Sequence, residues 1–198
     1  MFRALLVLIF IVTPTLVAAG EPLFDAATTG DTVAIEHLLA TGAMVDARTP
    51  DQATPLITAA LHGQEAVAKL LLSKGADVMA RNSGGFTALH AAAYSGSVPV
   101  ATLLLDSGAV RDDNKNKAGV VPFFVAVEMN HPEVVELLIA RGADVSQPEI
   151  HGYSAMTRAF WKGHKDMVRL LKRHGATCQQ VKMLDTEAYY QQCLEIKD

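Results

Sequence analysis

The sequence predicts an all-α solenoid, a stack of repeated helical pairs, and three features of the 198-residue chain indicate it. Gly-Ala pairs recur at residues 42–43, 75–76, 108–109, 142–143 and 175–176, at spacings of 33, 33, 34 and 33. An apolar helical segment precedes the inner pairs, as in VAKLLLSKGA and VVELLIARGA. A second apolar series lies further upstream in each repeat, as in TPLITAA and TALHAAA. A fixed period of this size is typical of stacked repeats, and here each repeat comprises two helices and a turn.

Residues 1–19 differ from the rest of the chain. A short start with Arg3 precedes an unbroken apolar run over 4–12, which ends before Pro14 and the small residues Ala18 and Ala19. That order is typical of a secretory signal peptide, so we expect cleavage after Ala18 or Ala19. The alternative is an uncleaved anchor, but the run is shorter than the roughly 20 residues that span a bilayer. We therefore expect a periplasmic or secreted protein with no stable membrane insertion after cleavage.

The repeats follow directly, in a domain over residues 20–177. Each Gly of a Gly-Ala pair suits the left-handed turn that ends a helix. Pro99 and Pro132 occupy the same repeat position at the start of the second helix, where a missing N–H costs nothing. These signals predict five repeats, at about 21–45, 46–78, 79–111, 112–145 and 146–177. Repeat 5 has Lys172 where the inner repeats have Leu or Ile, so we expect it to be the last.

Residues 178–198 are predicted to form a C-terminal capping segment. Asp185 is a plausible helix N-cap, and Tyr189, Cys193 and Ile196 would share one helical face. Cys178 and Cys193 are the two cysteines of the chain, and an even pair in an oxidising compartment favours a disulfide. The alternative is two free thiols, because one straight helix over 178–193 would hold its ends roughly 22 Å apart.

The composition argues against several functions. A formal net charge of -4 provides no overall basic field for nucleic acid, so we expect no nucleic-acid partner. Common hydrolase, dinucleotide-binding, zinc-protease and redox motifs are missing, which predicts a protein that is not an enzyme and has no cofactor. The DDNKNK stretch at 112–117 faintly resembles a calcium loop, but Lys117 replaces the required Gly. We interpret it as a solvated hairpin tip, and we expect no metal site.

The TALHAAAYSG and LLLDSGA segments resemble the ankyrin repeat. The resemblance covers residues 21–177 and implies paired antiparallel helices in a curved array with projecting hairpin loops. His90 occupies the fourth position of the T-P-L-H motif, whereas the other repeats have no His there. Their usual hydrogen bonds at that position are therefore not expected.

The resemblance also implies where a partner binds: at the hairpin tips and at the end of each first helix. Carried onto this chain, those places hold Arg48, Asp51, His62, Arg81, Phe86, Tyr94, Lys115, Lys117, Met129, Tyr153 and Trp161. Phe86, Tyr94, Tyr153 and Trp161 are then expected to line one face, and exposed aromatic residues commonly anchor protein interfaces. The alternative is that Tyr153 and Trp161 pack beneath the C-terminal tail.

The expected function is that of an exported, monomeric ankyrin-repeat protein of the bacterial periplasmic type, without catalysis of its own. It would bind another protein through its concave face, as a scaffold or accessory factor for an exported enzyme. A first alternative is an immunity or inhibitor protein that neutralises a toxin in the periplasm. A second is a thiol-based redox or small-molecule role, which free thiols at Cys178 and Cys193 would favour.

Overall fold

The computed structural model describes residues 21–179 and 186–196, which form helices, turns and loops without a strand. The predicted signal peptide and Asp185 lie outside these residues. The helices of the described part are α1 Glu21–Thr29, α2 Thr32–Ala40, α3 Pro55–Leu61, α4 Glu65–Ser73, α5 Ala88–Ser95, α6 Val98–Asp106, α7 Pro122–Glu128, α8 Pro132–Ala140, α9 Ala155–Trp161, α10 Lys165–Arg173 and α11 Thr186–Glu195. The all-α repeat solenoid predicted from the sequence is confirmed. None of these helices is long and apolar enough to cross a bilayer.

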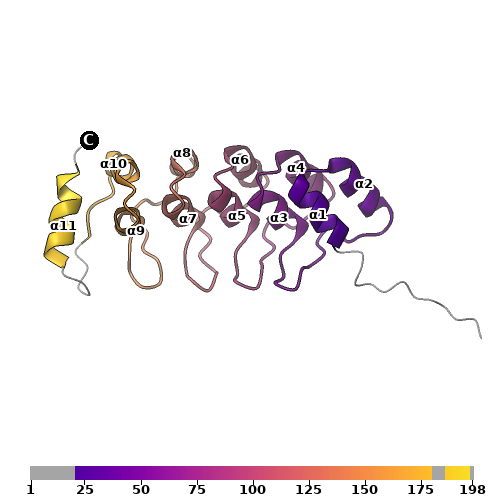
Figure 1. The fold of residues 1–198 in the computed structure, drawn as a ribbon, viewed down its shortest axis with the longest axis horizontal. Coiled ribbons are helices and arrows are strands. Elements are labelled where there is room, and N and C mark those ends of the chain that lie inside the picture. Colours follow the sequence, from indigo (N-terminus) through magenta and orange to yellow (C-terminus); the bar gives the residue numbers. More distant parts are fainter. Residues whose placement is uncertain (1–20, 180–185, 197–198) are drawn as a thin grey trace, which may run out of the picture.

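The helices form two rows that run the length of the molecule (Figure 1). The odd-numbered helices α1 to α9 stack in one row, and the even-numbered helices α2 to α10 lie beside them in the other. Loops between successive repeats project on the side of the odd-numbered row, and α11 lies at the C-terminal end. Each repeat therefore packs mainly against the repeats before and after it, as a solenoid requires.

Local sequence explains where the helices begin and end. The side chain of Thr54 accepts a hydrogen bond from the backbone N–H of Ile57 at 3.2 Å, and Ser154 caps α9 in the same way. Pro55 stands in the first turn of α3, where its fixed φ suits the helix. Gly96 ends α5 with φ +74°, a left-handed conformation that glycine adopts without strain. Caps of this kind satisfy the backbone groups at the ends of these short helices.

The core repeats with the sequence. In the second helices Leu71, Leu104, Leu138 and Leu171 occupy equivalent positions, and each is fully buried. Leu38, at the same position of the first repeat, is only partly buried because no repeat lies beyond it within the described residues. The interior is thus one continuous apolar cluster from α1 to α11, which Cys193 joins.

The structure changes the interpretation of the DDNKNK stretch. Asp113 is 4% exposed, so it does not belong to a solvated hairpin tip as predicted. Its carboxylate is buried against Arg81 of the preceding repeat. Lys115 and Lys117 are exposed, in agreement with that prediction. The stretch therefore alternates between residues that join two repeats and residues that face water.

The C-terminal end is closed by α11. The Nζ atom of Lys172 donates hydrogen bonds to the carbonyl oxygens of Cys193 and Ile196, both at 2.7 Å. A cation at the carbonyl end of a helix is favourable, so Lys172 holds α11 in place rather than providing a water-facing end for repeat 5. Cys178 and Cys193 form a disulfide with Cα atoms 6.0 Å apart, and Cys193 is fully buried.

Candidate functional site

An open groove of about 490 Å³ runs along the row of first helices, between α3, α5, α7 and α9 and the loops that precede them. We call it the inner groove. Its lining is mainly apolar at the centre and carries charged groups toward repeat 5. The residues that define it here are Ile57, Leu61, Phe86, His90, Tyr94, Phe124, Val125, Glu128, Met129, Glu149, His151 and Arg158.

The loops that form the walls of the groove are stabilised in the same way, by a side chain that accepts hydrogen bonds from the backbone of its own loop. Asn82, Asn116 and Glu149 occupy equivalent positions in successive loops, and each accepts hydrogen bonds from backbone N–H groups further along its loop. Asn82 bonds to the N–H groups of Gly84 and Phe86, both at 3.0 Å. Such side-chain contacts stabilise tight turns because they satisfy backbone groups that lack a helical partner.

Neighbouring loops are joined by Arg81 and Asp113. The guanidinium donates from Nη1 to Oδ2 at 2.7 Å and from Nη2 to Oδ1 at 2.9 Å, while Nη1 also donates to the carbonyl oxygen of Gly85. Burial alone raises the pKa of Asp113, but hydrogen bonds from Arg81 and from the N–H of Lys115 outweigh it and hold the pKa below its usual value. Arg81, predicted as a partner-binding residue, is thus engaged within the chain.

His90 forms the floor of the groove. Its Nδ1 accepts a hydrogen bond from the backbone N–H of Thr87 at 3.3 Å, and its Nε2 hydrogen-bonds to the carbonyl oxygen of Val120 at 3.1 Å. Burial lowers the pKa of His90, because the charged imidazolium would lose its hydration. The neutral ring ties α5 to the following loop, and Phe86 packs on its edge with ring centres 5.4 Å apart.

The predicted aromatic residues separate into two groups. Phe86 and Tyr94 line the inner groove, and Tyr94 is 53% exposed, which makes it an available anchor. Tyr153 and Trp161 instead pack edge to face, with ring centres 4.8 Å apart, and neither lines the groove. Trp161 is partly exposed, and the residue that faces α11 is its neighbour Phe160.

The remaining predicted contact residues lie at different places. Met129 lines the groove. The others are exposed and lie outside its lining: Arg48, Asp51, His62, Lys115 and Lys117. Arg48 donates hydrogen bonds to the carbonyl oxygens of Gln52 and Arg81, so it also joins two loops.

Sequence reasoning missed two charged groups of the groove. Arg158 lies over the Phe124 ring, 5.6 Å from its centre, and faces Glu128, whose Oε2 is 3.9 Å from Nε. Glu149 is buried and pairs with His151 at 2.8 Å. Burial favours a higher pKa for Glu149, but hydrogen bonds from His151 and Tyr153 outweigh it and lower the pKa. The sequence did contain a signal for Arg158: it is a charged residue at the repeat position where the two preceding repeats have the apolar residues Ala91 and Val125.

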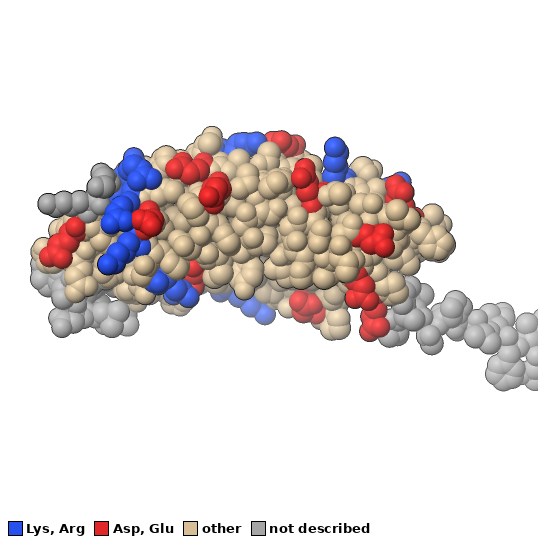
Figure 2. Space-filling view, turned by 45° about the horizontal axis from the view of Figure 1, so that its top comes forward, with Lys and Arg blue, Asp and Glu red and all other residues tan. Residues whose placement is uncertain are grey.

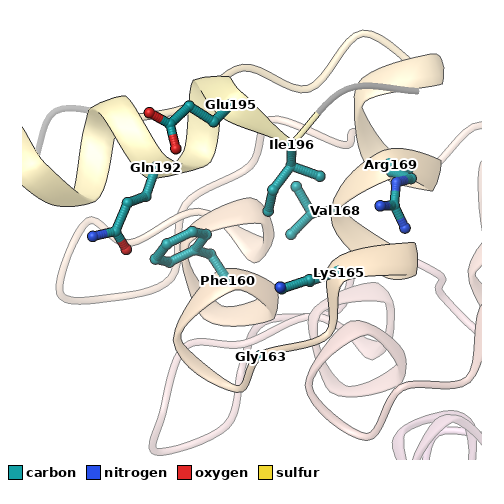
Figure 3. A pocket seen from close by; sticks show the side chains of 8 residues that line it. All are labelled: Phe160, Gly163, Lys165, Val168, Arg169, Gln192, Glu195 and Ile196. Atoms are coloured by element: carbon teal, nitrogen blue, oxygen red, sulfur yellow. The ribbon is translucent and has the colours of Figure 1, made fainter.

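A second groove of about 570 Å³ lies between α11 and the α9–α10 turn, and we call it the end groove (Figure 3). Phe160, Val168 and Ile196 form its apolar part, and Lys165 extends beneath them. Arg169, Gln192 and Glu195 complete the lining shown in Figure 3. The end groove contains both positive and negative side chains, and one of its walls is α11, which the disulfide holds in place. It is therefore a weaker candidate for a docking surface than the inner groove.

Charge is distributed unevenly along the solenoid. Figure 2 shows basic side chains gathered near the C-terminal end and acidic ones toward the N-terminal end. The basic group includes α10, which carries Lys165, Arg169, Lys172 and Arg173. Within residues 21–179 and 186–196, no cluster of His, Cys, Asp and Glu side chains is arranged to hold a metal ion.

Comparisons with known proteins agree with this architecture. A family model described as "Ankyrin repeats (3 copies)" matches residues 23–117, 80–149 and 111–182. The chain is also similar to the mouse (Mus musculus) protein "Ankyrin repeat and SAM domain-containing protein 6", with 39% identity over 62 residues. That match covers 31% of this chain and 7% of the mouse protein, so it concerns a short stretch of repeats.

Proposed function

The chain belongs to the ankyrin-repeat family, and from that premise we propose that it is an exported adaptor that binds a protein partner through the inner groove. Ankyrin repeats indicate a protein–protein interaction module and are typically non-enzymatic. The observation that carries the proposal is the groove itself, which has a volume of about 490 Å³ and a mainly apolar lining in which Tyr94 is exposed. Apolar surface rimmed by polar groups is characteristic of interaction sites.

Two features support the proposed export. The first is the order of residues in 1–19, which is typical of a cleaved signal peptide. The second is the disulfide between Cys178 and Cys193, since such bonds persist in oxidising compartments. Sequencing the N-terminus of protein purified from the exported fraction would test this. We expect the mature chain to begin at Ala19 or Gly20, and a chain that retains Met1 would contradict it.

The groove favours an accessory role over the two alternatives. Glu128, Glu149 and Arg158 all line the groove, so it lacks the uniformly acidic surface that would suit a basic toxin. A thiol-based role is disfavoured because Cys178 and Cys193 are bonded to each other. We therefore propose a scaffold or accessory factor that acts as a monomer, and light scattering of the purified protein would give the oligomeric state.

Site-specific photo-crosslinking would test the docking surface. A photoreactive amino acid replaces Tyr94 in the groove, and a matched control replaces Lys69, an exposed residue of α4 in the other row of helices. We expect a discrete covalent adduct from position 94 and none from position 69 when the protein is irradiated in the exported fraction. An adduct of equal yield from position 69, or none from position 94, would place the interface elsewhere.

A further inference from the structure

Arg158 has an unusual environment in the inner groove. Its guanidinium is supported by the Phe124 ring, 5.6 Å from the ring centre. Its Nε atom is buried and has no hydrogen-bond acceptor among the residues that the structure describes. Glu128 Oε2 lies 3.9 Å from it, which is outside hydrogen-bond range. A partner cannot reach this buried atom directly, but the Arg158 side chain is 31% exposed, so an acceptor from outside the chain can approach the exposed part of its guanidinium.

Other polar groups of the groove already have partners. Glu149 accepts from the backbone N–H of Tyr153 at 3.2 Å and pairs with His151. His90 is hydrogen-bonded on both ring nitrogens, to Thr87 and to Val120. These groups build the loops, so they have little left to offer a ligand. Arg158 differs from them because its position is fixed by a ring contact rather than by hydrogen bonds.

The charges around Arg158 are unbalanced. The carboxylate of Glu128 is shared between Arg158 and Lys162, whose Nζ lies 3.3 Å from Oε1. One carboxylate thus faces two cations. Beyond these two cations, α10 in the other row of helices carries four Lys and Arg side chains and a single acidic residue, Asp166, which adds positive charge at this end of the solenoid. A second carboxylate at this end of the groove would be electrostatically complementary.

We propose that the partner segment in the inner groove carries a carboxylate that accepts a hydrogen bond from Arg158, next to apolar side chains that cover Tyr94 and Met129. The inference rests on the proposed function, because it takes the groove to be the docking surface. A guanidinium matches a carboxylate in geometry and charge, and exclusion of water by the apolar lining strengthens the pair. The carboxylate belongs to an Asp or Glu side chain or to a chain terminus.

A random-peptide library displayed on phage, selected on the purified disulfide-bonded protein, provides the probe. Enriched peptides are synthesised with free and with amidated C-termini and with each Asp or Glu replaced by Asn or Gln, and their dissociation constants are measured by fluorescence polarisation. We expect replacement of the carboxylate by its amide to weaken binding about 10-fold or more, the range of a hydrogen bond to a charged group. The same replacement should change binding less than about 2-fold on Arg158→Gln, because the partner group is gone.

The controls distinguish failure of the proposed carboxylate contact from failure of the proposed docking groove. Lys69→Gln, on the other row of helices, should bind every peptide like the unaltered protein, and circular dichroism checks that Arg158→Gln is folded. Peptides that need Tyr94 and Met129 but tolerate loss of the carboxylate would overturn the inference alone. Peptides that bind equally to Tyr94→Ala with Met129→Ala, or a selection without enrichment, would overturn the proposed function and the inference with it. Weaker binding after amidation identifies a terminal carboxylate, and weaker binding after an Asn or Gln replacement identifies a side chain. Binding that neither change weakens would overturn the inference.

Discussion

The ion pair between Arg81 and Asp113 joins repeat 3 to repeat 4, and Asp113→Asn should weaken the stack substantially. The Asp113 side chain is 3% exposed and that of Arg81 is 27% exposed. Removing one partner of a buried pair costs about 3–5 kcal/mol. Arg81 is partly hydrated and keeps its hydrogen bond to Gly85, so we expect the lower end, about 3 kcal/mol of unfolding free energy.

Urea unfolding followed by circular dichroism at pH 7 measures this loss. Asp112→Asn is the matched control, because Asp112 is adjacent and pairs with Arg111 at 3.0 Å, with side chains that are 37% and 43% exposed. Exposed pairs contribute about 0–1 kcal/mol, so the control should lose little. If Asp113→Asn loses no more than Asp112→Asn, the pair does not couple the repeats and the reasoning fails.

The same pair predicts a pH dependence. The pKa of Asp113 is lower in the folded protein than its usual value of 3.8, so its contribution is fully present above that pH. The contribution is lost as the pH falls through the folded pKa. The stability difference between the unaltered protein and Asp113→Asn should therefore shrink in acid below pH 3.8. A difference that stays constant there would refute the assignment.

Three further predictions concern other parts of the fold. Because burial lowers the pKa of His90, its protonation opposes folding, and the stability of the protein should fall as the pH drops below the usual value of 6.5. Urea unfolding at pH 7.5 and 5.5 measures this fall, and the stability of His90→Gln should depend less on pH than that of the unaltered protein. Gly85→Ala should lose at least about 1 kcal/mol more unfolding free energy than Gly152→Ala. Both glycines have φ near +85°, but only at Gly85 would a Cβ lie 2.7 Å from the Cα of Asn116. Equal losses in the two variants would contradict the clash. Cys193→Ser should destabilise the α11 cap by about 3 kcal/mol through loss of a 15-residue loop closure, visible as faster amide exchange in α11, and unchanged exchange would contradict it.

The fold followed from the sequence because its signals are local and repeated. Leu71, Leu104 and Leu138 recur with the period of the Gly-Ala pairs, and each is buried as a helix of that pattern requires. The resemblance to the ankyrin repeat pointed to Tyr94 and Met129 at the ends of first helices, and both line the groove. The same rule does not hold in every copy, because His62 and Trp161, at the end of the first helix in repeats 2 and 5, lie outside the groove lining.

The charged part of the groove did not follow in this way. Arg158 looks like a solvated residue of a short helix until Phe124 and Glu128 of the preceding repeat are placed beside it. Asp113 lies in a run of six polar residues that reads as a loop exposed to water. Its burial depends on how one loop packs on the next, and no local pattern encodes that contact.

The sequence by itself therefore determined the repeat, the number and order of its helices and the position of the core, because helix periodicity and capping act within a few residues. Only the tertiary structure decided which polar side chains meet. Arg81 and Asp113 are 32 residues apart, and Lys172 reaches the end of a helix 21 residues further on. Such contacts depend on loop conformation and side-chain direction, which are settled when neighbouring repeats pack together and polar groups that lose water must find partners.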